Sequence, residues 1–523
     1  MVSVILLCSC NNVETIPDTY VFRYNEHKNI SSLDPAFSKD IADIWATNQI
    51  FNGLVQMDSA LNVLPCIAKH WSVAKNALSY TFYLRNDVYF HKHYLFGNDS
   101  TRTVTAQDFE YSLNRLRNKR TASPGSWVLN KVESFKAVND TVFKIELKQP
   151  FPAFLGLLTM KYCSVVPKEI VEHYKNDFRS NPIGTGPFKF KRWEENIKLV
   201  LRKNYNYFEK DDFGNTLPYM EAVAITFLPD KQSEFLQFAQ GNIDFMSGLD
   251  ASYKDDILTA KGELRDSYTK AVTMIRGPYL NTEYLGFYLN SELTEIQSEY
   301  IRKAVNYGFD RKKMMLYLRN GIGIPAEGGF IPKGLPGHNK NIGYTYNPEK
   351  AKQLIARFKS ETGIDSPTIT IVTTNNYLSF CEYIQRELQK TGLTVAVDVV
   401  PPTTLKDAKA NGKIDFFRAS WVADYPDAEN YLSLYYSKNM APNGPNYTHF
   451  KNYNFDIWYE QAFTETNTKK RAFLYAKMDS LVMQKAPIVP LFYDEAVRFT
   501  QKNVTGLGIN PINLLDLKQV KKE

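Results

Sequence analysis

A cation, a large aromatic ring and a carboxylate lie within one seven-residue stretch of the sequence, as Arg418, Trp421 and Asp424. The apolar residues just before them predict a short strand, and the sequence ADYP, which contains Tyr425 and Pro426, predicts a loop. In open α/β sheets, ligands bind outside the carboxyl ends of strands. A cation and an anion there, with an aromatic platform between them, would suit a zwitterionic ligand such as a peptide. A surface ion pair after a buried strand fits the same residues, and this segment alone leaves both interpretations open.

The segment that precedes this loop has the pattern of a βαβ unit. Residues 368–373 alternate in polarity as a strand does, and residues 393–400 do so again. Between them, residues 377–390 carry apolar side chains at helical spacing, and Gly392 follows where a left-handed cap is needed. Such crossovers are almost always right-handed. We therefore expect the loop at Asp424 to extend from a packed α/β layer.

Other segments predict strands and helices without one regular alternation. Thr105 can cap a helix that carries Asp108 at its third position, and residues 347–349 (NPE) mark another helix start. Residues 488–493 predict a strand, and its proline, Pro490, favours an edge or end position in a sheet. The chain of 523 residues is long enough for about three domains. The mixture argues for several α/β lobes and against one barrel or one Rossmann sheet.

Charge, hydropathy and cysteine usage exclude several classes of protein. The net charge of +7 is small for this length, and no long basic block is present, which argues against nucleic-acid binding. No stretch reaches the roughly 18 apolar residues that span a bilayer. Outside the N-terminus, the cysteines have no zinc-site spacing, and we interpret them as buried, reduced core residues: Cys66, Cys163 and Cys381.

The first ten residues, MVSVILLCSC, are similar to the end of a bacterial lipoprotein signal. Residues 7–10 (LCSC) resemble a lipobox, in which cleavage falls before Cys10 and Cys10 carries the lipid. No charged residue precedes the apolar run, although signal peptides need one. We interpret this departure as a misassigned start codon, with a chance apolar start as the alternative. Residues 1–16 would then be a signal remnant and tether, and the protein would be attached to a membrane by its lipid.

A hydrolase is the main competing class. The sequence has neither a GxSxG elbow nor an HExxH motif. His91 and His93 are two residues apart with no third ligand nearby, which is more typical of solvated side chains than of a metal site. Paired carboxylates discriminate nothing in a chain with 56 acidic residues.

Seven stretches, in order, resemble the family 5 solute-binding proteins of bacterial ABC importers, which bind oligopeptides, dipeptides or nickel. They cover nearly the whole chain: SLDP at 32–35, QIFNGL at 49–54, VTAQDFEYSLNRL at 104–116, IGTGPF at 183–188, GNID at 241–244, IRKAVNYGFD at 301–310 and IVPL at 488–491. Each is weak alone, and their number and order make the match specific.

The resemblance implies an α/β fold of the type II periplasmic-binding-protein kind, with two lobes closing on a cleft and an additional third domain. Lobe I would combine residues 17–52, 175–265 and 487–523. The additional domain II would span residues 53–174, and lobe III residues 266–486. Ligand would be enclosed when the lobes close about a hinge.

The resemblance also implies roles for the residues of the opening segment. In oligopeptide binders of the family, RAGWCAD carries the peptide contacts, and this chain has RASWVAD at 418–424, with Ser420 as a departure. Asp424 would hold the ligand's α-amino group, and Arg418 a C-terminal carboxylate on ligands of suitable length. Trp421 would line a side-chain pocket, and Tyr425 belongs to the same expected site.

The implied function is that of a non-enzymatic, monomeric component of an ABC importer. It would capture peptides in the cell envelope, in the periplasm, and deliver them to permease subunits in the inner membrane without any cofactor. A nickel or haem-type ligand is an alternative, although His449 is the only histidine near the expected cleft segment. An oligosaccharide is another, but sugars do not need both Asp424 and Arg418.

Overall fold

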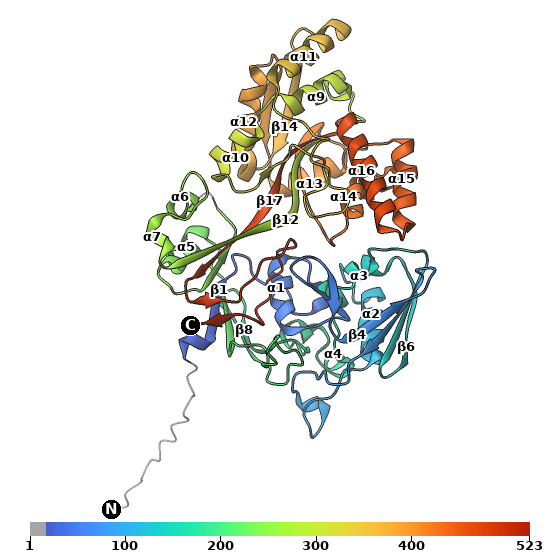
Figure 1. Cartoon of the computed structure of the whole chain (residues 1–523), viewed down its shortest axis with the longest axis vertical. Helices are drawn as coiled ribbons and strands as arrows, with labels where there is room; N and C mark the ends of the chain where they lie inside the picture. The colour runs from blue at the N-terminus through green and yellow to red at the C-terminus, as the bar shows by residue number, and fades with distance from the viewer. Residues whose placement is uncertain (1–16, 251) are drawn as a thin grey trace, which may run out of the picture.

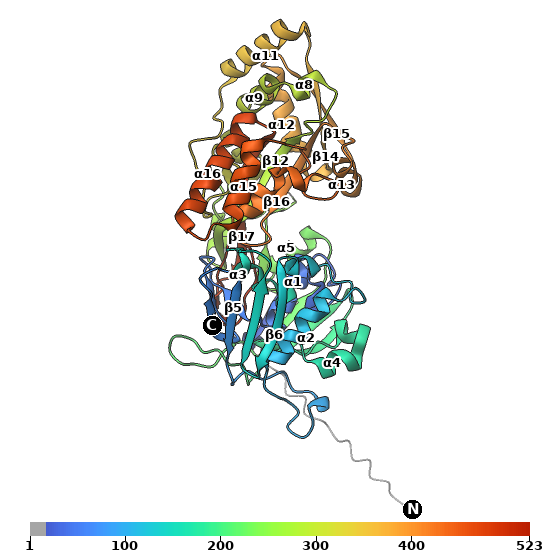
Figure 2. The same ribbon diagram turned by 90° about the vertical axis from the view of Figure 1, so that its right-hand side faces the viewer.

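The computed structural model describes residues 17–250 and 252–523 and divides them into a lower and an upper body (Figure 1). Cys10 lies outside the described residues. Two long antiparallel strands, β12 (Val272–Phe287) and β17 (Ile488–Gln501), run from one body into the other. The view turned by 90° shows the same separation (Figure 2). None of the described helices is long and apolar enough to cross a membrane.

One mixed sheet runs through both bodies, and β12 and β17 lie at its centre. In spatial order its strands are β15 (Thr394–Val399), β14 (Thr368–Thr373), β16 (Phe416–Val422), β12, β17, β11 (Phe245–Ser247), β1 (Val21–Asn25), β10 (Ala222–Thr226), β9 (Lys198–Lys203) and β8 (Phe188–Glu194), with β13 (Ile324–Pro325) paired to β17. The β12–β17 ladder changes register between Pro278 and Thr282, and again between Glu283 and Tyr284.

The expectation that Pro490 marks an edge or end position in the sheet is wrong, because β17 is a central strand. Pro490 pairs with Tyr284, at the second register shift of the ladder. A bulge leaves a residue out of the regular hydrogen-bond ladder, so a residue without an N–H is tolerated there. The Pro490 carbonyl also accepts a hydrogen bond of 2.7 Å from Arg311 Nε.

The lower body is built from segments that are far apart in the sequence. Its helices are α1 (Ile41–Ile50), α4 (Lys168–Tyr174), α5 (Lys231–Ala239), α6 (Lys254–Ile257) and α7 (Asp266–Thr269). A short C-terminal ribbon of β18 (Val504–Thr505) and β19 (Lys521–Lys522) completes it. Trp45 on α1 donates a hydrogen bond of 2.8 Å to the Asn513 carbonyl, and Asn48 donates one of 2.9 Å to Leu515. Leu515 and Leu517 are fully buried in the same core as Trp45.

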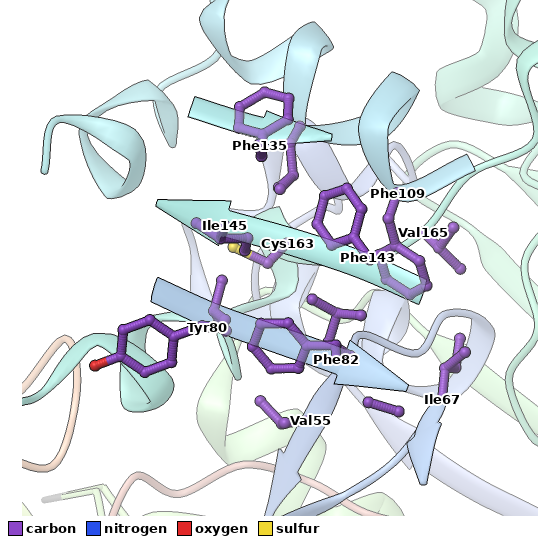
Figure 3. Packing of buried hydrophobic residues seen from close by; sticks show 14 of the residues in the cluster. Val55, Ile67, Tyr80, Phe82, Phe109, Phe135, Phe143, Ile145, Cys163 and Val165 are labelled. Carbon is purple, nitrogen blue, oxygen red and sulfur yellow. The ribbon is translucent and has the colours of Figure 1, made fainter. Parts of the chain in front are cut away.

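A contiguous part of the lower body has its own sheet and core. Its strands are β2 (Val55–Met57) paired with β3 (Val63–Pro65), and the antiparallel set β4 (Ala68–Val73), β5 (Ser79–Leu84), β7 (Val142–Leu147) and β6 (Val132–Asn139). Helices α2 (Ala106–Arg117) and α3 (Phe154–Leu157) belong to it, and Figure 3 shows Phe82, Phe109 and Phe143 in its core. The predicted capping box forms at α2, where the Thr105 N–H donates to Asp108 at 2.9 Å.

A close approach between α1 and the strand-entry loop explains the glycines of IGTGPF. A Cβ on Gly186 would lie 2.5 Å from the Gln49 carbonyl oxygen, and one on Gly184 would lie 2.1 Å from the Ile50 oxygen. Both contacts are with backbone atoms, which cannot rotate away. Only glycine therefore lets this loop pass the end of α1.

The upper body has helices on both faces of its part of the sheet. They are α8 (Thr294–Gln297), α9 (Glu299–Tyr307), α10 (Arg311–Arg319), α11 (Pro348–Thr362), α12 (Leu378–Gln389), α13 (Pro402–Ala410), α14 (Glu429–Leu432), α15 (Tyr453–Thr464) and α16 (Thr468–Lys485). The predicted βαβ unit is confirmed: β14 and β15 are parallel and α12 connects them. Asn347 caps α11, and Gly392 has the expected positive φ, at 91°.

Two separate apolar clusters show which residues of β16 point to which face. Phe416 belongs to the cluster that contains Ile384 of α12, whereas Phe417 and Ala419 belong to the cluster that contains Met478 of α16. Successive side chains of a strand point to opposite faces. Even-numbered residues of β16 therefore face α12, and odd-numbered residues face the α14–α16 side.

Candidate functional site

A cavity of about 340 Å³ lies between the two bodies. Seven separate parts of the chain line it: residues 38–45 around the start of α1, residue 57, residue 127, residues 159–162 after α3, residue 279 on β12, residues 422–426 at the end of β16 and in the loop after it, and residues 512–514 in the C-terminal segment. Its lining residues are Ser38, Lys39, Ile41, Ile44, Trp45, Met57, Trp127, Thr159, Met160, Lys161, Tyr162, Tyr279, Val422, Ala423, Asp424, Tyr425, Pro426, Ile512 and Leu514. The site is thus completed only when both bodies are present.

Asp424 lies just beyond the carboxyl end of β16, in the predicted loop, and its side chain is exposed to this cavity. Asn430 holds it: the Asp424 N–H donates to Asn430 Oδ1 at 3.1 Å, and Asn430 Nδ2 donates to Asp424 Oδ2 at 3.2 Å. Desolvation by the cleft walls raises the pKa of Asp424, and the bond from Asn430 opposes that shift. Within the described part of the chain, no cationic side chain forms an ion pair with it. Asp424 is therefore an oriented carboxylate without a counter-ion.

Tyr425 forms a wall between this cavity and a second one of about 540 Å³. It is buried, and its hydroxyl donates to Glu429, as does the hydroxyl of Tyr459. The second cavity also contains Glu460, which accepts hydrogen bonds of 2.5 Å from Tyr436 and 2.8 Å from Lys438. The carboxylates of the second cavity accept hydrogen bonds from tyrosine hydroxyls and a lysine. Among the described residues, the Asp424 carboxylate accepts a side-chain hydrogen bond only from the Asn430 amide.

Trp421 does not line either cavity. Its indole Nε1 donates to Asn430 Oδ1 at 2.8 Å, so that Asn430 accepts from both Trp421 and the Asp424 backbone. Trp421 therefore braces the residue that orients Asp424. Sequence patterns do not single out Asn430, since an asparagine six residues along a loop and short helix has no distinctive spacing.

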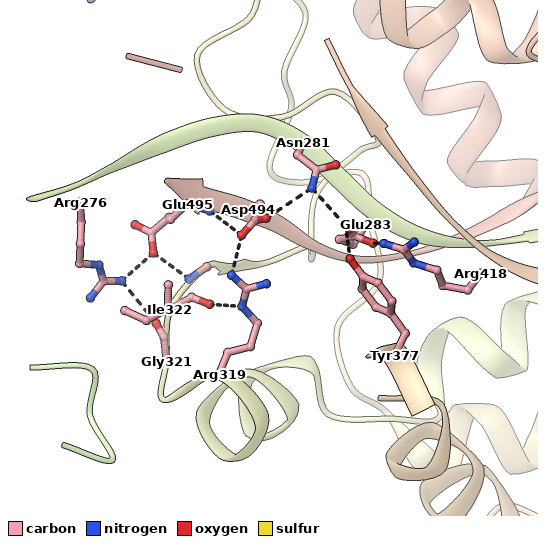
Figure 4. A network of polar contacts seen from close by, with 11 residues as sticks. Arg276, Asn281, Glu283, Arg319, Gly321, Ile322, Tyr377, Arg418, Asp494 and Glu495 are labelled. Carbon is pink, nitrogen blue, oxygen red and sulfur yellow. Dashed lines mark hydrogen bonds and ion pairs between the residues drawn. The ribbon is translucent and has the colours of Figure 1, made fainter. Parts of the chain in front are cut away.

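Arg418 lies on the opposite face of β16 from Trp421, because the two residues are three positions apart in this strand and successive side chains point to opposite faces. The two side chains therefore do not share one platform. The Arg418 guanidinium forms an ion pair with the buried Glu283 of β12 and stacks over Tyr377, with 3.3 Å from Cζ to the ring centroid (Figure 4). Tyr377 and Asn281 also donate to Glu283, at 3.2 and 3.1 Å. Arg418 is absent from the lining of the cavity that contains Asp424.

The cations of that cavity come from the lower body and were not singled out in the sequence. Lys39 precedes α1 and is exposed, and Lys161 is partly buried. Lys161 Nζ donates a hydrogen bond of 2.7 Å to Asn48 Oδ1 on α1. Lysines at these positions could be recognised only once the chain had brought α1 and the segment around residue 161 beside Asp424.

The histidines considered in the sequence have hydrogen-bond partners in the protein. His91 is buried, not solvated as expected: its Nδ1 accepts from the Gly184 N–H at 3.3 Å, and Nε2 lies 3.0 Å from the Gly186 oxygen. Burial lowers its pKa to about 4. His93 Nε2 contacts the Tyr174 hydroxyl, and His449 Nε2 contacts the Ala441 carbonyl. Among the described residues, no group of three or more His, Cys, Asp or Glu could hold a metal ion. The prediction of unpaired core cysteines is confirmed for Cys66, Cys163 and Cys381.

Comparison with known proteins gives a family for this arrangement. The profile of the bacterial extracellular solute-binding proteins, family 5 Middle, matches residues 62–443, which is most of the chain. The chain belongs to this family. Its two-body α/β architecture is that of a type II periplasmic binding protein.

Relatives match over almost their whole length. The dipeptide-binding protein of Escherichia coli (strain K12) is 24% identical over 497 residues, which cover 91% of this chain and 89% of the relative. The glutathione-binding protein GsiB of Salmonella choleraesuis is 22% identical over 494 residues, covering 92% and 91%. The structure of the periplasmic binding protein DppA from Helicobacter pylori in complex with the peptide STSA has a TM-score of 0.78 and 24% identity, covering 96% of this chain and 98% of DppA.

Proposed function

We propose that this solute-binding protein captures peptides in the cavity between its two bodies and delivers them unchanged to the membrane permease of an ABC importer. The observation that carries the proposal is the Asp424 carboxylate, which Asn430 orients and which has no counter-ion among the described residues. Relatives that bind dipeptides, glutathione and the peptide STSA support a peptide as the ligand.

In this proposal Asp424 binds the ammonium group of the peptide. The ligand would supply the ion-pair partner that Asp424 lacks among the described residues. The raised pKa of Asp424 has the same cause, since a carboxylate in a partly desolvated cleft lacks compensation for its charge. An ammonium group beside it would restore that compensation and lower the pKa again. Trp421 and Tyr425 would act as the support and the wall of this subsite.

The role of Asp424 is tested by the substitution Asp424→Asn together with N-acetylated peptides. Removing one partner of a desolvated charge pair costs about 2–5 kcal/mol, which is about 30-fold to several-thousand-fold in affinity. We expect isothermal titration calorimetry to show a loss of that size for the variant, and poor binding of acetylated peptides by the wild type. Asp365→Asn, at an exposed site in the upper body, is the control and should bind normally. Equal affinity for free and acetylated peptides would refute the role.

Arg418 as the partner of a ligand's C-terminal carboxylate stays a prediction. Glu283 and Tyr377 engage its guanidinium, so a ligand carboxylate would have to share it with Glu283. If Arg418 meets only longer ligands, Arg418→Ala should weaken binding of some peptide lengths and spare others. A uniform loss with a lowered melting temperature would instead identify a structural role.

We also propose the domain division and the location in the periplasm as a lipid-anchored monomer. Separate buried clusters, which contain Phe82, Phe22 and Leu285 respectively, support the division into domain II (53–174), lobe I (17–52, 175–265 and 487–523) and lobe III (266–486). Lipidation of Cys10 is supported only by the similarity of residues 7–10 to a lipobox. Partition of the natural protein into detergent, and its loss in Cys10→Ser, would test the anchor.

A further inference from the structure

The 340 Å³ cavity has an unequal number of positive and negative side chains. Of its lining residues, only Lys39, Lys161 and Asp424 carry full charges. Asp40 follows Lys39 in the chain, but it does not line the cavity. The cavity wall therefore carries two cations and one anion. A ligand with one ammonium and one carboxylate would leave one of the two lysines without a partner.

Lys161 has the clearest need for a counter-ion. Burial is the largest influence on its pKa, which is lowered, and no carboxylate of the described residues forms an ion pair with it. Asp516 and Lys518 lie near enough to act on it with opposite signs. Among the described residues its ammonium group donates one hydrogen bond, to the neutral Asn48 amide, and none of them accepts from its other two N–H donors. A partly buried ammonium group with no counter-ion is unfavourable, and an anion in the cavity would relieve it.

Lys39, just before the start of α1, is the second lysine on the cavity wall. Its side chain is exposed, and the structure shows no hydrogen-bond or ion-pair partner for its ammonium group within the described residues. An ordinary surface lysine would be in water on all sides, whereas this one lies on the wall of a cavity that also contains Lys161. The two lysines belong to the lower body, and Asp424 belongs to the upper body, so a ligand that meets all three bridges the bodies.

We propose that the preferred ligands are short peptides with one free ammonium group and two carboxylates, the second one on a side chain. Asp424 holds the ammonium group, and Lys39 and Lys161 each receive a carboxylate. This inference rests on the proposed peptide-binding function and adds the charge of the ligand. The cavity volume lies near the lower end of the roughly 300–1,000 Å³ of small-molecule sites, which favours a ligand of only a few residues.

The test compares two peptides that differ in one charge, Ala-Glu-Ala and its near-isostere Ala-Gln-Ala. We expect calorimetry on the full-length protein to show that Ala-Glu-Ala binds at least about tenfold more tightly, which corresponds to about 1.4 kcal/mol. Lys161→Gln and Lys39→Gln should each reduce this preference while still binding Ala-Gln-Ala. Lys75→Gln, at an exposed site in the β4–β5 turn, is the matched control and should keep the full preference.

The outcomes separate this inference from the function on which it rests. If Ala-Gln-Ala binds and Ala-Glu-Ala is not preferred, the charge assignment is overturned and the peptide-binding function stands. A preference that both lysine variants retain would overturn the roles of Lys39 and Lys161. If neither peptide binds, the inference and the proposed function fail together. Because Lys39 is exposed, Lys39→Gln should fold even if Lys161→Gln does not, and the wild-type comparison needs no variant.

Discussion

Glu283→Gln is the substitution that best separates structural from ligand-binding roles in the upper body. Glu283 is nearly inaccessible, with 3% of its side chain exposed, and its partner Arg418 has 14% exposed. The two residues are 135 positions apart, on the adjacent strands β12 and β16, so their ion pair joins these strands. Burial raises the pKa of Glu283, and Arg418 is the largest influence that opposes this shift.

The size of the stability loss follows from the positive charge of Arg418, which the substitution leaves without an anionic partner. A glutamine side chain at this position could still accept hydrogen bonds from Tyr377 and Asn281, but Arg418 would keep its charge without an anion. Breaking a buried pair by removing one partner costs about 3–5 kcal/mol, and the remaining exposure of Arg418 argues for about 3 kcal/mol here. For a cooperative unit of about 200 residues, a loss of that size lowers the melting temperature by about 6–12 °C.

Thermal unfolding followed by circular dichroism, with no ligand present, measures this effect. Glu194→Gln is the control, because its ion pair with Arg192 is exposed, with 44% and 72% of the side chains accessible, and should contribute less than about 1 kcal/mol. A melting temperature for Glu283→Gln within about 1–2 °C of the wild type would refute the reasoning. It would show that Arg418 does not depend on Glu283 and is free to serve a ligand.

Two further predictions concern stability away from the cavity. Gly186→Ala should lower the free energy of unfolding by about 1–3 kcal/mol or more, because its Cβ would meet the α1 backbone, whereas Gly508→Ala, with open space around it, should be neutral in the same denaturant titration. Burial raises the pKa of Asp479 from 3.8 to about 7, so the folded state holds its proton more tightly than the unfolded state. Its contribution to the free energy of unfolding therefore falls by about 4 kcal/mol as pH rises from about 4 to about 7 and stays constant above that. Denaturant titrations at several pH values measure the free energy of unfolding of Asp479→Asn and of the wild type. Across this pH window the variant should become more stable relative to the wild type. A stability difference that does not change with pH would contradict the assignment.

Local patterns in the sequence predicted individual elements well. The cap residues of α2 and α11 act through neighbours three positions away, so Thr105 and Asn347 could be interpreted without tertiary structure. The βαβ unit and the loop at Asp424 were predicted for the same reason. The predicted loop of residues 423–426 starts directly after the observed end of β16 at Val422.

What the sequence could not predict depends on contacts between distant residues. Whether Arg418 meets a ligand or Glu283 is decided by the register of β16 against β12, which local patterns do not specify. Pro490 is tolerated centrally because of a bulge whose position depends on both strands. Asp424 was predicted as a site residue from the residue types of its segment and from a resemblance, both of which can be read along the chain. Lys161 had no such indication, because its proposed role depends on the folded chain bringing it to the same cavity as Asp424.

The hydrogen bonds between α1 and the C-terminal segment set an order for the folding of a newly synthesised chain. Asn513, whose carbonyl binds Trp45, is made 468 residues after it. At about 5–20 residues per second, the ribosome needs roughly 25–90 seconds to supply it. Meanwhile the part of the chain with β4–β7 can complete its own core, because all of its strands are contiguous. The N-terminal end of the protein is therefore among the last parts to finish folding, and a chain that stops before Leu515 leaves the core around α1 without the buried side chains of Leu515 and Leu517 however long it waits.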